Sequence, residues 1–263
     1  MLSLSQIRNF YPGAPQDTQT SIHLLKEYIE LMTLNFLSSS KYIGKLSFIG
    51  GTNLRLVKGI DRFSEDLDFD CKKLGNEEFM AMTDDVIRFL QRSGLPAVAK
   101  DKESDKLSAM RRTISFPEYL FSIGLASQAE RDRKFILKIE AQDQGIEYER
   151  VNSTIISDGF HFQFPTPSDS TLCAMKCATV LSRGKGRDFY DTLFLLQLAQ
   201  PDYEYLEAHN GIKDSAMLKE AMLSRLSAID LSMKAKDFKF LAFDADKASV
   251  ILNFKESFLQ LLQ

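Results

Sequence analysis

Three aspartates, Asp66, Asp68 and Asp70, alternate with apolar residues in the stretch DLDFD. This alternation predicts a β-strand, in which every second side chain leaves from the same face. Three like charges on one face repel one another, and their ionised forms are costly in an apolar setting unless a partner neutralises them. Divalent cations, which take oxygen ligands, are suitable partners. The spacing therefore indicates a metal-binding strand, although a solvated strand edge would show the same alternation.

Two carboxylates at alternate strand positions can hold divalent cations jointly, and a third carboxylate from a neighbouring strand completes a two-metal site. Asp66 and Asp68 are the candidate pair, with Asp70 as an accessory group. Glu140, in the predicted strand KFILKIEAQ, is the candidate third ligand, and a surface carboxylate is an equally good interpretation of it. Such a site aligns an attacking hydroxyl, polarises an α-phosphate and stabilises departing pyrophosphate.

The glycine pair Gly50-Gly51, followed by Thr52, precedes a short predicted helix. Glycine lets backbone N–H groups approach an anion closely, and a helix N-terminus adds partial positive charge. A tight strand-to-helix turn with a threonine cap is the simpler interpretation. Asp66 lies fourteen positions after Thr52, so a short helix would bring the turn and the acidic strand side by side. A phosphate cradle would then face the predicted metal site.

A basic group lies further along, in AMKCATVLSRGKGRDFYDTLFL at residues 174–195. Lys176 and Arg183 are seven residues apart and so share a helical face, and Lys185 follows in a glycine-containing loop. These cations could bind the phosphates of a triphosphate. Arg187 comes next, followed by two carboxylates at the start of another predicted helix, a position favoured by the helix dipole. Those carboxylates are Asp188 and Asp191. A helix-start ion-pair network would explain Arg187 and Asp188 nearly as well.

Hydrophobic periodicity predicts the elements that must position these residues. Up to about residue 165 we expect a mixed α/β half, and beyond Pro165 and Pro167 nearly everything indicates helix. The fold class is therefore α+β with a mixed sheet, divided into a core at 1–165 and a helical domain at 166–263. The expected helices are 17–38, a short one after Gly51, 76–93, 168–182, 187–199, 213–230 and 246–262, and the expected strands are 45–49, 66–70, 107–116, 134–141, 151–156 and 160–164.

Composition narrows the function classes. Hydrophobic content of 44% and charged content of 26% are typical of an ordinary globular protein. A net charge of −3 and a pI near 5.7 argue against indiscriminate nucleic-acid binding, whereas a local basic groove is compatible with them. Three cysteines and three scattered histidines form neither a disulfide framework nor a zinc motif. Without a long apolar run or a secretory leader, we expect a cytoplasmic protein with no membrane partner. The twenty phenylalanines are interpreted as mostly core residues, and their spacing predicts no base-stacking platform.

The motifs carry a family resemblance. Gly50-Gly51-Thr52-x-Leu54, followed by Arg62-x-Ser64-x-Asp66-Leu67-Asp68-Phe69, resembles the nucleotidyltransferase toxins of the AbiEii type, also called MenT-like, in the DNA polymerase β-like superfamily. Residues 174–195 resemble the downstream pattern of that family. The resemblance implies a polymerase-β-like core followed by a C-terminal helical bundle. It also implies that Asp66 and Asp68 bind Mg²⁺, that Lys176 contacts phosphate, that Asp191 or Asp188 assists, and that Gly50, Gly51, Thr52, Arg62, Ser64, Arg183, Lys185 and Arg187 surround the nucleotide.

The resemblance further implies an activity. A nucleoside monophosphate would pass from an NTP to an acceptor, with tRNA 3′ ends as the leading substrate and a cognate antitoxin as partner, in a toxin–antitoxin or phage-defence system. One alternative is a nucleotidyltransferase that modifies a small molecule, as aminoglycoside-modifying enzymes do. Another is a catalytically inactive interaction protein. Retention of the carboxylates and Lys176 together argues against the inactive protein, because a binding module has no need of a self-repelling strand.

Overall fold

The structure is a computed structural model that describes residues 2–100 and 109–263. The chain divides into two compact units. The first comprises Met1–Val57, Ser64–Gln144 and Asn152–Thr166, and the second comprises Lys58–Phe63, Gly145–Val151 and Pro167–Gln263. The last segment of the second unit begins at Pro167, near the predicted boundary at 165, but two short segments of the predicted core at 1–165 also belong to the second unit. The division into a nucleotidyltransferase core and a helical domain stays a prediction.

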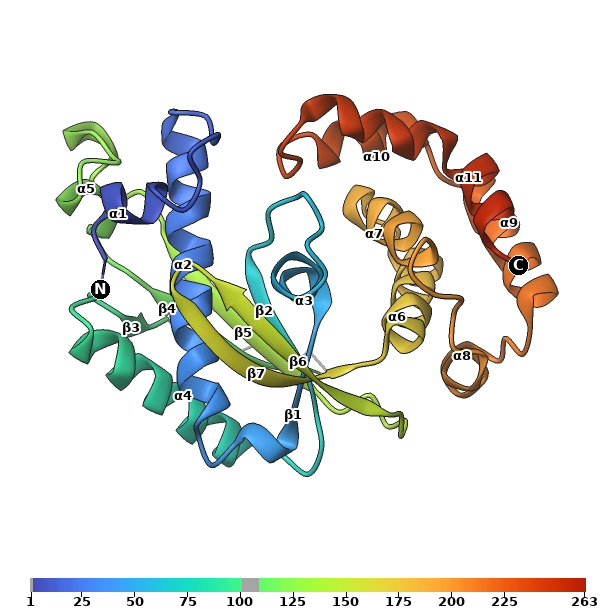
Figure 1. Cartoon of the computed structure of the whole chain (residues 1–263), viewed down its shortest axis with the longest axis horizontal. Helices are drawn as coiled ribbons and strands as arrows, with labels where there is room; N and C mark the ends of the chain where they lie inside the picture. Colours follow the sequence, from blue (N-terminus) through green and yellow to red (C-terminus); the bar gives the residue numbers. More distant parts are fainter. Residues whose placement is uncertain (1, 101–108) are drawn as a thin grey trace. The chain divides into compact units, whose positions relative to one another are not determined.

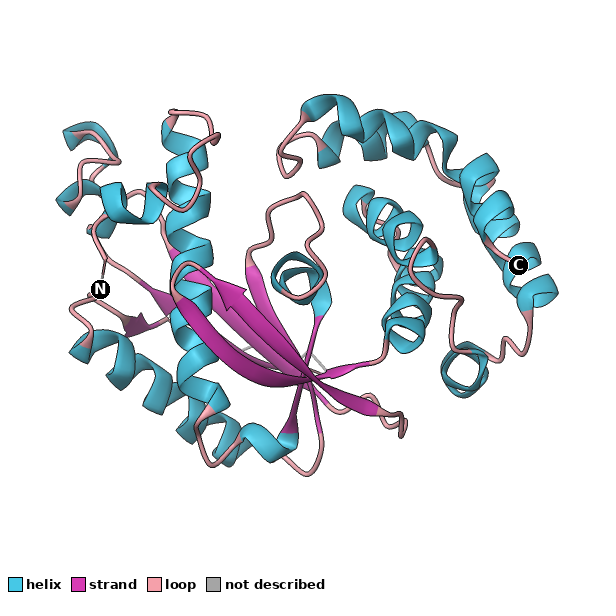
Figure 2. Ribbon diagram, in the orientation of Figure 1, coloured by secondary structure: helices cyan, strands magenta, loops and turns pink. Residues whose placement is uncertain are grey.

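A five-stranded mixed sheet forms the centre of the first unit, in the order β1-β2-β5-β4-β3 (Figure 2). Neighbouring strands run antiparallel except β2 and β5, which are parallel. Two further strands, β6 and β7, pair as a separate sheet. The predicted α+β class with a mixed sheet is confirmed. The strands are β1 (Leu46–Ile49), β2 (Asp66–Cys71), β3 (Val98–Ala99), β4 (Met110–Ser115), β5 (Ile136–Gln142), β6 (Arg150–Ser157) and β7 (Phe160–Pro167). The first residues of the predicted strand 107–116 lie outside the described residues.

The alternation in β2 separates a core face from a polar face. Leu67 and Phe69 are buried, and the Phe69 ring packs against Phe164 with centroids 5.7 Å apart. Asp66 and Asp68 are half-buried. Asp70 is different, because it is only 1% exposed and accepts a hydrogen bond from the backbone N–H of Gln144 at 2.9 Å. The three aspartates therefore do not share one environment, and Asp70 serves the loop that follows β5.

The helices of the first unit cover the sheet (Figure 1). The longest, α2, begins after an aspartate cap: the Asp17 carboxylate accepts from the backbone N–H of Thr20 at 2.8 Å. It packs against α4, where the rings of Phe36 and Phe89 stack with centroids 4.7 Å apart. The predicted helices 17–38 and 76–93 are both confirmed. The elements are α1 (Leu4–Arg8), α2 (Thr18–Ser38), η1 (Ile43–Lys45), α3 (Gly50–Leu56), α4 (Asn76–Arg92), α5 (Tyr119–Ser122) and η2 (Gln128–Glu130).

The second unit is helical, as predicted, but with shorter helices than expected. Its elements are α6 (Asp169–Ser182), α7 (Gly186–Leu196), α8 (Tyr203–Asn210), α9 (Ser215–Leu226), α10 (Leu231–Phe238), η3 (Ala245–Asn253) and α11 (Phe254–Leu261). The predicted helix 213–230 is shorter in the structure: α9 ends at Leu226, and Asp230 instead caps the next helix, accepting from the N–H groups of Ser232 and Met233. The predicted helix 246–262 is divided into η3 and α11. Within the described residues, none of the helices combines the length and apolar character that crossing a membrane would require.

Candidate active site

The glycine turn passes directly over the acidic strand. Ile49, the last residue of β1, pairs with Asp68 of β2 in the antiparallel register. Gly50 follows with φ of +80°, in the left-handed region that favours glycine. A Cβ at Gly50 would lie 2.8 Å from the Asp68 Cβ and 2.9 Å from its Cγ, and closer still to Oδ2. Glycine is therefore required here both by the backbone conformation and by the close approach to the carboxylate. The predicted proximity of turn and acidic strand is confirmed.

Side-chain hydrogen bonds fix α3 to the strands on either side of it. The Thr52 hydroxyl donates to the backbone carbonyl of Asp66 at 2.6 Å, and the Asn53 amide donates to the carbonyl of Phe48 at 2.8 Å. Both side chains are fully buried. The Thr52 hydroxyl is thus engaged inside the fold, so phosphate binding by this turn would fall to the backbone N–H groups of its first residues, which have no partner within the helix.

Charged side chains accompany the acid pair on the neighbouring strand. In the parallel register Asp66 is opposite Lys138 and Asp68 is opposite Glu140, while the apolar positions between them face the core. The Lys138 ammonium lies 3.2 Å from Asp66 Oδ1. Glu140 therefore lies beside Asp68, as its predicted role requires, but its carboxylate also pairs with Arg111 at 2.8 Å. In residues 2–100 and 109–263, no group of three or more His, Cys, Asp or Glu side chains is arranged to hold a metal ion.

A buried glutamate in α2 lies close enough to Asp66 for the two groups to interact electrostatically. Glu30 is 1% exposed, and among the described residues its Oε1 atom has no hydrogen-bond partner. Burial raises the pKa of Glu30; Lys26 opposes this, whereas the charges of Glu27 and Asp66 add to it. The orphaned buried oxygen and the half-buried aspartates offer the carboxylate chemistry that oxygen-binding cations use, although the described residues do not gather three such side chains around one point. The chemistry of these residues therefore fits Mg²⁺, and the ligand set Asp66, Asp68 and Glu140 stays a prediction.

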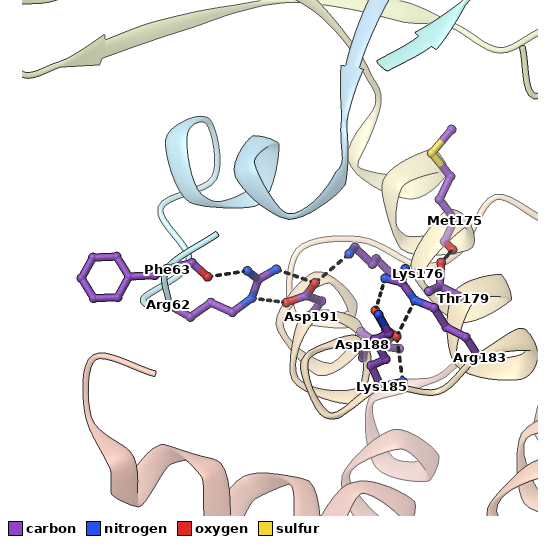
Figure 3. Close-up of polar contacts among 10 residues, drawn as sticks. Arg62, Phe63, Met175, Lys176, Thr179, Arg183, Lys185, Asp188 and Asp191 are labelled. Atoms are coloured by element: carbon purple, nitrogen blue, oxygen red, sulfur yellow. Dashed lines mark hydrogen bonds and ion pairs between the residues drawn. The ribbon is translucent and has the colours of Figure 1, made fainter. Parts of the chain in front are cut away.

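The second unit holds a buried ion cluster of Arg62, Asp191 and Lys176 (Figure 3). Arg62 is wholly buried, and its Nε and Nη2 atoms donate to the two carboxylate oxygens of Asp191, both at 2.6 Å. The Lys176 ammonium lies 2.7 Å from Asp191 Oδ2. Burial by itself would raise the pKa of Asp191, but Arg62 and Lys176 hold it at about 2. Two cations share one carboxylate, so the cluster carries net positive charge. Lys176, with 10% of its side chain exposed, has more access to solvent than the other two.

The structure gives Arg62 different partners from the nucleotide that the motif predicts. Its third nitrogen, Nη1, donates to the backbone carbonyl of Phe63 at 2.9 Å, so the whole guanidinium is engaged inside the protein. Ser64, two residues on, is half-buried. Arg62 therefore supports the carboxylate that lies beside Lys176.

Asp188 takes part in a separate network at the start of α7. Arg183 donates to both of its carboxylate oxygens, at 3.0 and 2.9 Å, and the Lys185 backbone N–H donates to Oδ2 at 2.9 Å (Figure 3). Asp188 is fully buried, Lys185 is exposed and Arg187 is half-buried. The sequence allowed a helix-start ion-pair network of Arg187 and Asp188 as an alternative to a catalytic role, and in the structure the cation that pairs with Asp188 is Arg183. Of the two downstream carboxylates, Asp191 is the one that contacts the predicted phosphate-binding lysine.

The candidate residues thus form two groups. Gly50, Gly51, Thr52, Ser64, Asp66, Asp68 and Glu140 belong to the first unit, and Arg62, Lys176, Arg183, Lys185, Arg187, Asp188 and Asp191 belong to the second. Sequence reasoning missed Lys138 and Glu30. Lys138 shares the alternate face of its strand with Glu140, so the same alternation would have identified it. Glu30 lies within a long apolar helix and gives no local signal.

A model of the family described as "Nucleotidyl transferase AbiEii toxin, Type IV TA system" matches residues 34–262. The chain belongs to this family. The resemblance carried by GGT and DLDF is therefore confirmed, and the protein is a nucleotidyltransferase toxin of a type IV toxin–antitoxin system. Membership implies an NTP substrate and an antitoxin context.

Solved structures share the fold. MenT4, a nucleotidyltransferase toxin from Mycobacterium tuberculosis, matches with a TM-score of 0.55 and 15% identity over the whole of both chains. JHP933 from Helicobacter pylori matches with a TM-score of 0.51 and 19% identity over 91% of each chain. Among curated protein sequences, none gives a significant match. At these identities the structural matches establish the fold alone, and they agree with the predicted nucleotidyltransferase architecture.

Proposed function

We propose that this toxin transfers a nucleoside monophosphate from an NTP to a hydroxyl of an RNA acceptor, with tRNA 3′ ends as the leading substrate. The observation that carries the proposal is the approach of the Gly50 backbone to the Asp68 carboxylate. It supports the proposal because a turn that could bind phosphate would then lie beside oxygen ligands that could bind a divalent cation. An NTP complexed with a divalent cation presents both of these chemistries.

In this proposal Asp66 and Asp68 hold Mg²⁺, which when bound polarises the α-phosphate and neutralises charge on the departing pyrophosphate. The protein's own groups bind and orient the nucleotide. The backbone N–H groups of Gly50 and Gly51 contact phosphate oxygens. Lys176 contacts the triphosphate, because its cluster has an excess of positive charge and Asp191 fixes the ammonium at 2.7 Å. Asp191 acts through Lys176, so it is a positioning residue.

The reaction replaces one phosphorus–oxygen bond by another. The acceptor hydroxyl oxygen bonds to the α-phosphorus, the bond between that phosphorus and the α,β-bridging oxygen breaks, and pyrophosphate leaves with both electrons of that bond. The hydroxyl proton passes to solvent or to a nearby carboxylate. Glu140, beside Asp68 in the register, is our candidate third ligand, and its ion pair with Arg111 would open when a cation binds.

The test is transfer of label from each NTP, radiolabelled at the α-phosphate, to total cellular RNA in the presence of Mg²⁺. We expect label in a band the size of tRNA, and we expect chelation of divalent cations to abolish it. Asp66→Ala and Asp68→Ala should each abolish transfer while the protein remains folded. Asp132→Ala removes an exposed aspartate of the same unit and should retain activity. Full activity in both site variants would refute the assignment of these carboxylates.

The proposal also identifies the acceptor as tRNA and the protein partner as a cognate antitoxin. A tRNA acceptor is supported by the family resemblance of the motifs. Label on a protein or on a small molecule, and none on RNA, would show that the acceptor belongs to a different class. The antitoxin should restore growth to cells that express the toxin. Growth inhibition by the wild-type chain, but not by Asp68→Ala, would connect toxicity with transfer.

A further inference from the structure

Two cationic side chains lie among the carboxylates of the predicted metal site. Strands β2, β5 and β4 are neighbours in the sheet (Figure 1), and their registers form two rows across its polar face. One row consists of Asp66, Lys138 and Thr113, and the other consists of Asp68, Glu140 and Arg111. Side chains at paired positions of adjacent strands share a face and are close enough to interact. The nucleotide chemistry proposed above assigns no function to Lys138 or Arg111.

Each of these cations pairs with a carboxylate that is a predicted metal ligand. The Lys138 ammonium lies 3.2 Å from Asp66 Oδ1, and the Nε atom of Arg111 lies 2.8 Å from Glu140 Oε1. The four side chains are between 22% and 40% exposed, so solvent and dissolved ions reach both pairs. Ion pairs that water reaches contribute little to stability. Either pair can therefore exchange partners at small cost.

The pair with Arg111 holds Glu140 on the side of its strand that faces β4. Glu140 has Asp68 opposite it in β2 and Arg111 opposite it in β4, and its carboxylate contacts the arginine. Within residues 2–100 and 109–263, three His, Cys, Asp or Glu side chains nowhere converge as a metal site requires. Convergence of Glu140 with the acid pair therefore requires Arg111 to release it.

Negative charge exceeds positive charge on this face of the sheet. At the paired positions of β2, β5 and β4, the charged residues of the polar face are the acids Asp66, Asp68, Asp70 and Glu140 and the bases Lys138 and Arg111. Glu30, which interacts electrostatically with Asp66, adds no positive charge, and the basic residues Lys26 and Arg55 pair with Glu65 and Glu27. The face thus attracts a further cation even with Lys138 and Arg111 in place.

We propose that Lys138 and Arg111 are exchangeable counter-charges of the metal site. They neutralise Asp66 and Glu140 in the folded protein, and they release these carboxylates when a divalent cation binds. Both act through a carboxylate, so they are positioning residues. The exchange makes them competitors of the metal, and removing either one should strengthen metal binding. Loss of a metal ligand has the opposite effect. The inference rests on the proposed function, because it requires that these carboxylates bind the cation.

The test is binding of Mn²⁺ to the full chain without nucleotide, measured by electron paramagnetic resonance of the free ion at neutral pH and fixed ionic strength. Mn²⁺ takes the same oxygen ligands as Mg²⁺. We expect Lys138→Met and Arg111→Met each to bind Mn²⁺ about two- to fivefold more tightly than the wild type, in line with the contribution of an exposed ion pair. The double variant should bind more tightly than either single one. Lys138→Arg keeps the charge and should retain the affinity of the wild type.

Two other ion pairs of the first unit provide matched controls. Lys72 lies 3.2 Å from Asp143 and Arg131 lies 2.8 Å from Glu118, the same separations as in the two proposed pairs. Neither Asp143 nor Glu118 is a predicted metal ligand. Lys72→Met and Arg131→Met should therefore leave Mn²⁺ affinity within about 1.5-fold of the wild type, because their charges are screened from the site.

The outcomes separate this inference from the proposed function. Mn²⁺ affinity that is unchanged or weaker in Lys138→Met and Arg111→Met would overturn the counter-charges, and so would a wild type that binds no Mn²⁺. If Asp68→Ala abolishes Mn²⁺ binding and the wild type transfers nucleotide, the proposed function still holds in the first case. Tighter Mn²⁺ binding in the two cation variants, without nucleotide transfer by the wild type, would support the counter-charges and refute the proposed function.

Discussion

Replacing Asp191 by asparagine tests the buried cluster directly. The substitution keeps the shape of the side chain and removes its charge, while Arg62 stays in a fully buried position and Lys176 in a nearly buried one. Two cations would then remain without a counter-charge. Breaking a buried ion pair by removing one partner costs about 3–5 kcal/mol, much of which is the uncompensated charge left behind. We expect the free energy of unfolding of the helical unit to fall by this amount at neutral pH.

The pH dependence gives a second measure of the same interaction. The pKa of Asp191 is about 2 in the folded protein against an ordinary value of 3.8, a difference worth about 2 kcal/mol. Because the folded pKa is the lower one, this stabilisation is complete above about pH 4 and is lost as the pH falls toward 2. The stability difference between wild type and Asp191→Asn should therefore narrow over that range, which a neutral packing defect would not produce.

The assay is urea unfolding followed by circular dichroism at several pH values. Asp237→Asn, at an exposed aspartate of the same unit, serves as the control and should change stability by less than about 0.5 kcal/mol. Replacing both partners, with Arg62→Met and Asp191→Leu, should recover much of the loss, because no unpaired charge stays fully buried. Two results would refute a stabilising role for the buried charge pair. One is an Asp191→Asn variant as stable as the control. The other is a double variant whose loss in free energy of unfolding equals the sum of the losses in the two single variants.

Two further predictions concern the first unit. Gly50→Ala should reduce transfer at least about tenfold, because the new Cβ displaces the Asp68 carboxylate and the added strain of positive φ is of order 1–2 kcal/mol. Gly59→Ala is the control, because Gly59 also has a positive φ, of +74°, but has open space around the Cβ position. This variant introduces the backbone strain without the collision. Equal losses of activity in the two variants would contradict the explanation. Thr52→Val should lower stability by about 1–3 kcal/mol in thermal or urea unfolding, because the backbone carbonyl of Asp66 loses the donor that the buried Thr52 side chain supplies. Thr52→Ser keeps the hydroxyl and should therefore retain most of the stability that the hydrogen bond contributes. If Thr52→Ser lowers the free energy of unfolding as much as Thr52→Val does, the hydrogen bond is not the cause.

Local patterns were sufficient for the longest and most periodic elements. The α2 and α4 helices follow from apolar residues at helical spacing. Strand β2 follows from alternation, and its register with β5 brings Asp68 beside Glu140 as the predicted site requires. The short α8 and α10 were not predicted, because one or two helical turns carry too few residues to establish a period.

The sequence by itself determined the chemistry available: a glycine turn, an acid pair two residues apart, and a lysine with downstream carboxylates. These are local features, which spacing along one strand or helix defines. Only the tertiary structure decided how each group is used. Arg62 and Asp191 are 129 positions apart, and no pattern in either segment predicts that they pair in the interior. Likewise Asp70 becomes buried while Asp66 and Asp68 stay half-exposed, and Phe240 stays in solvent while most phenylalanines are buried. Such differences arise from packing between distant segments. The solvent exposure of a residue and its choice of charged partner depend on what surrounds it in the folded protein. The residues next to it in the sequence do not define these surroundings.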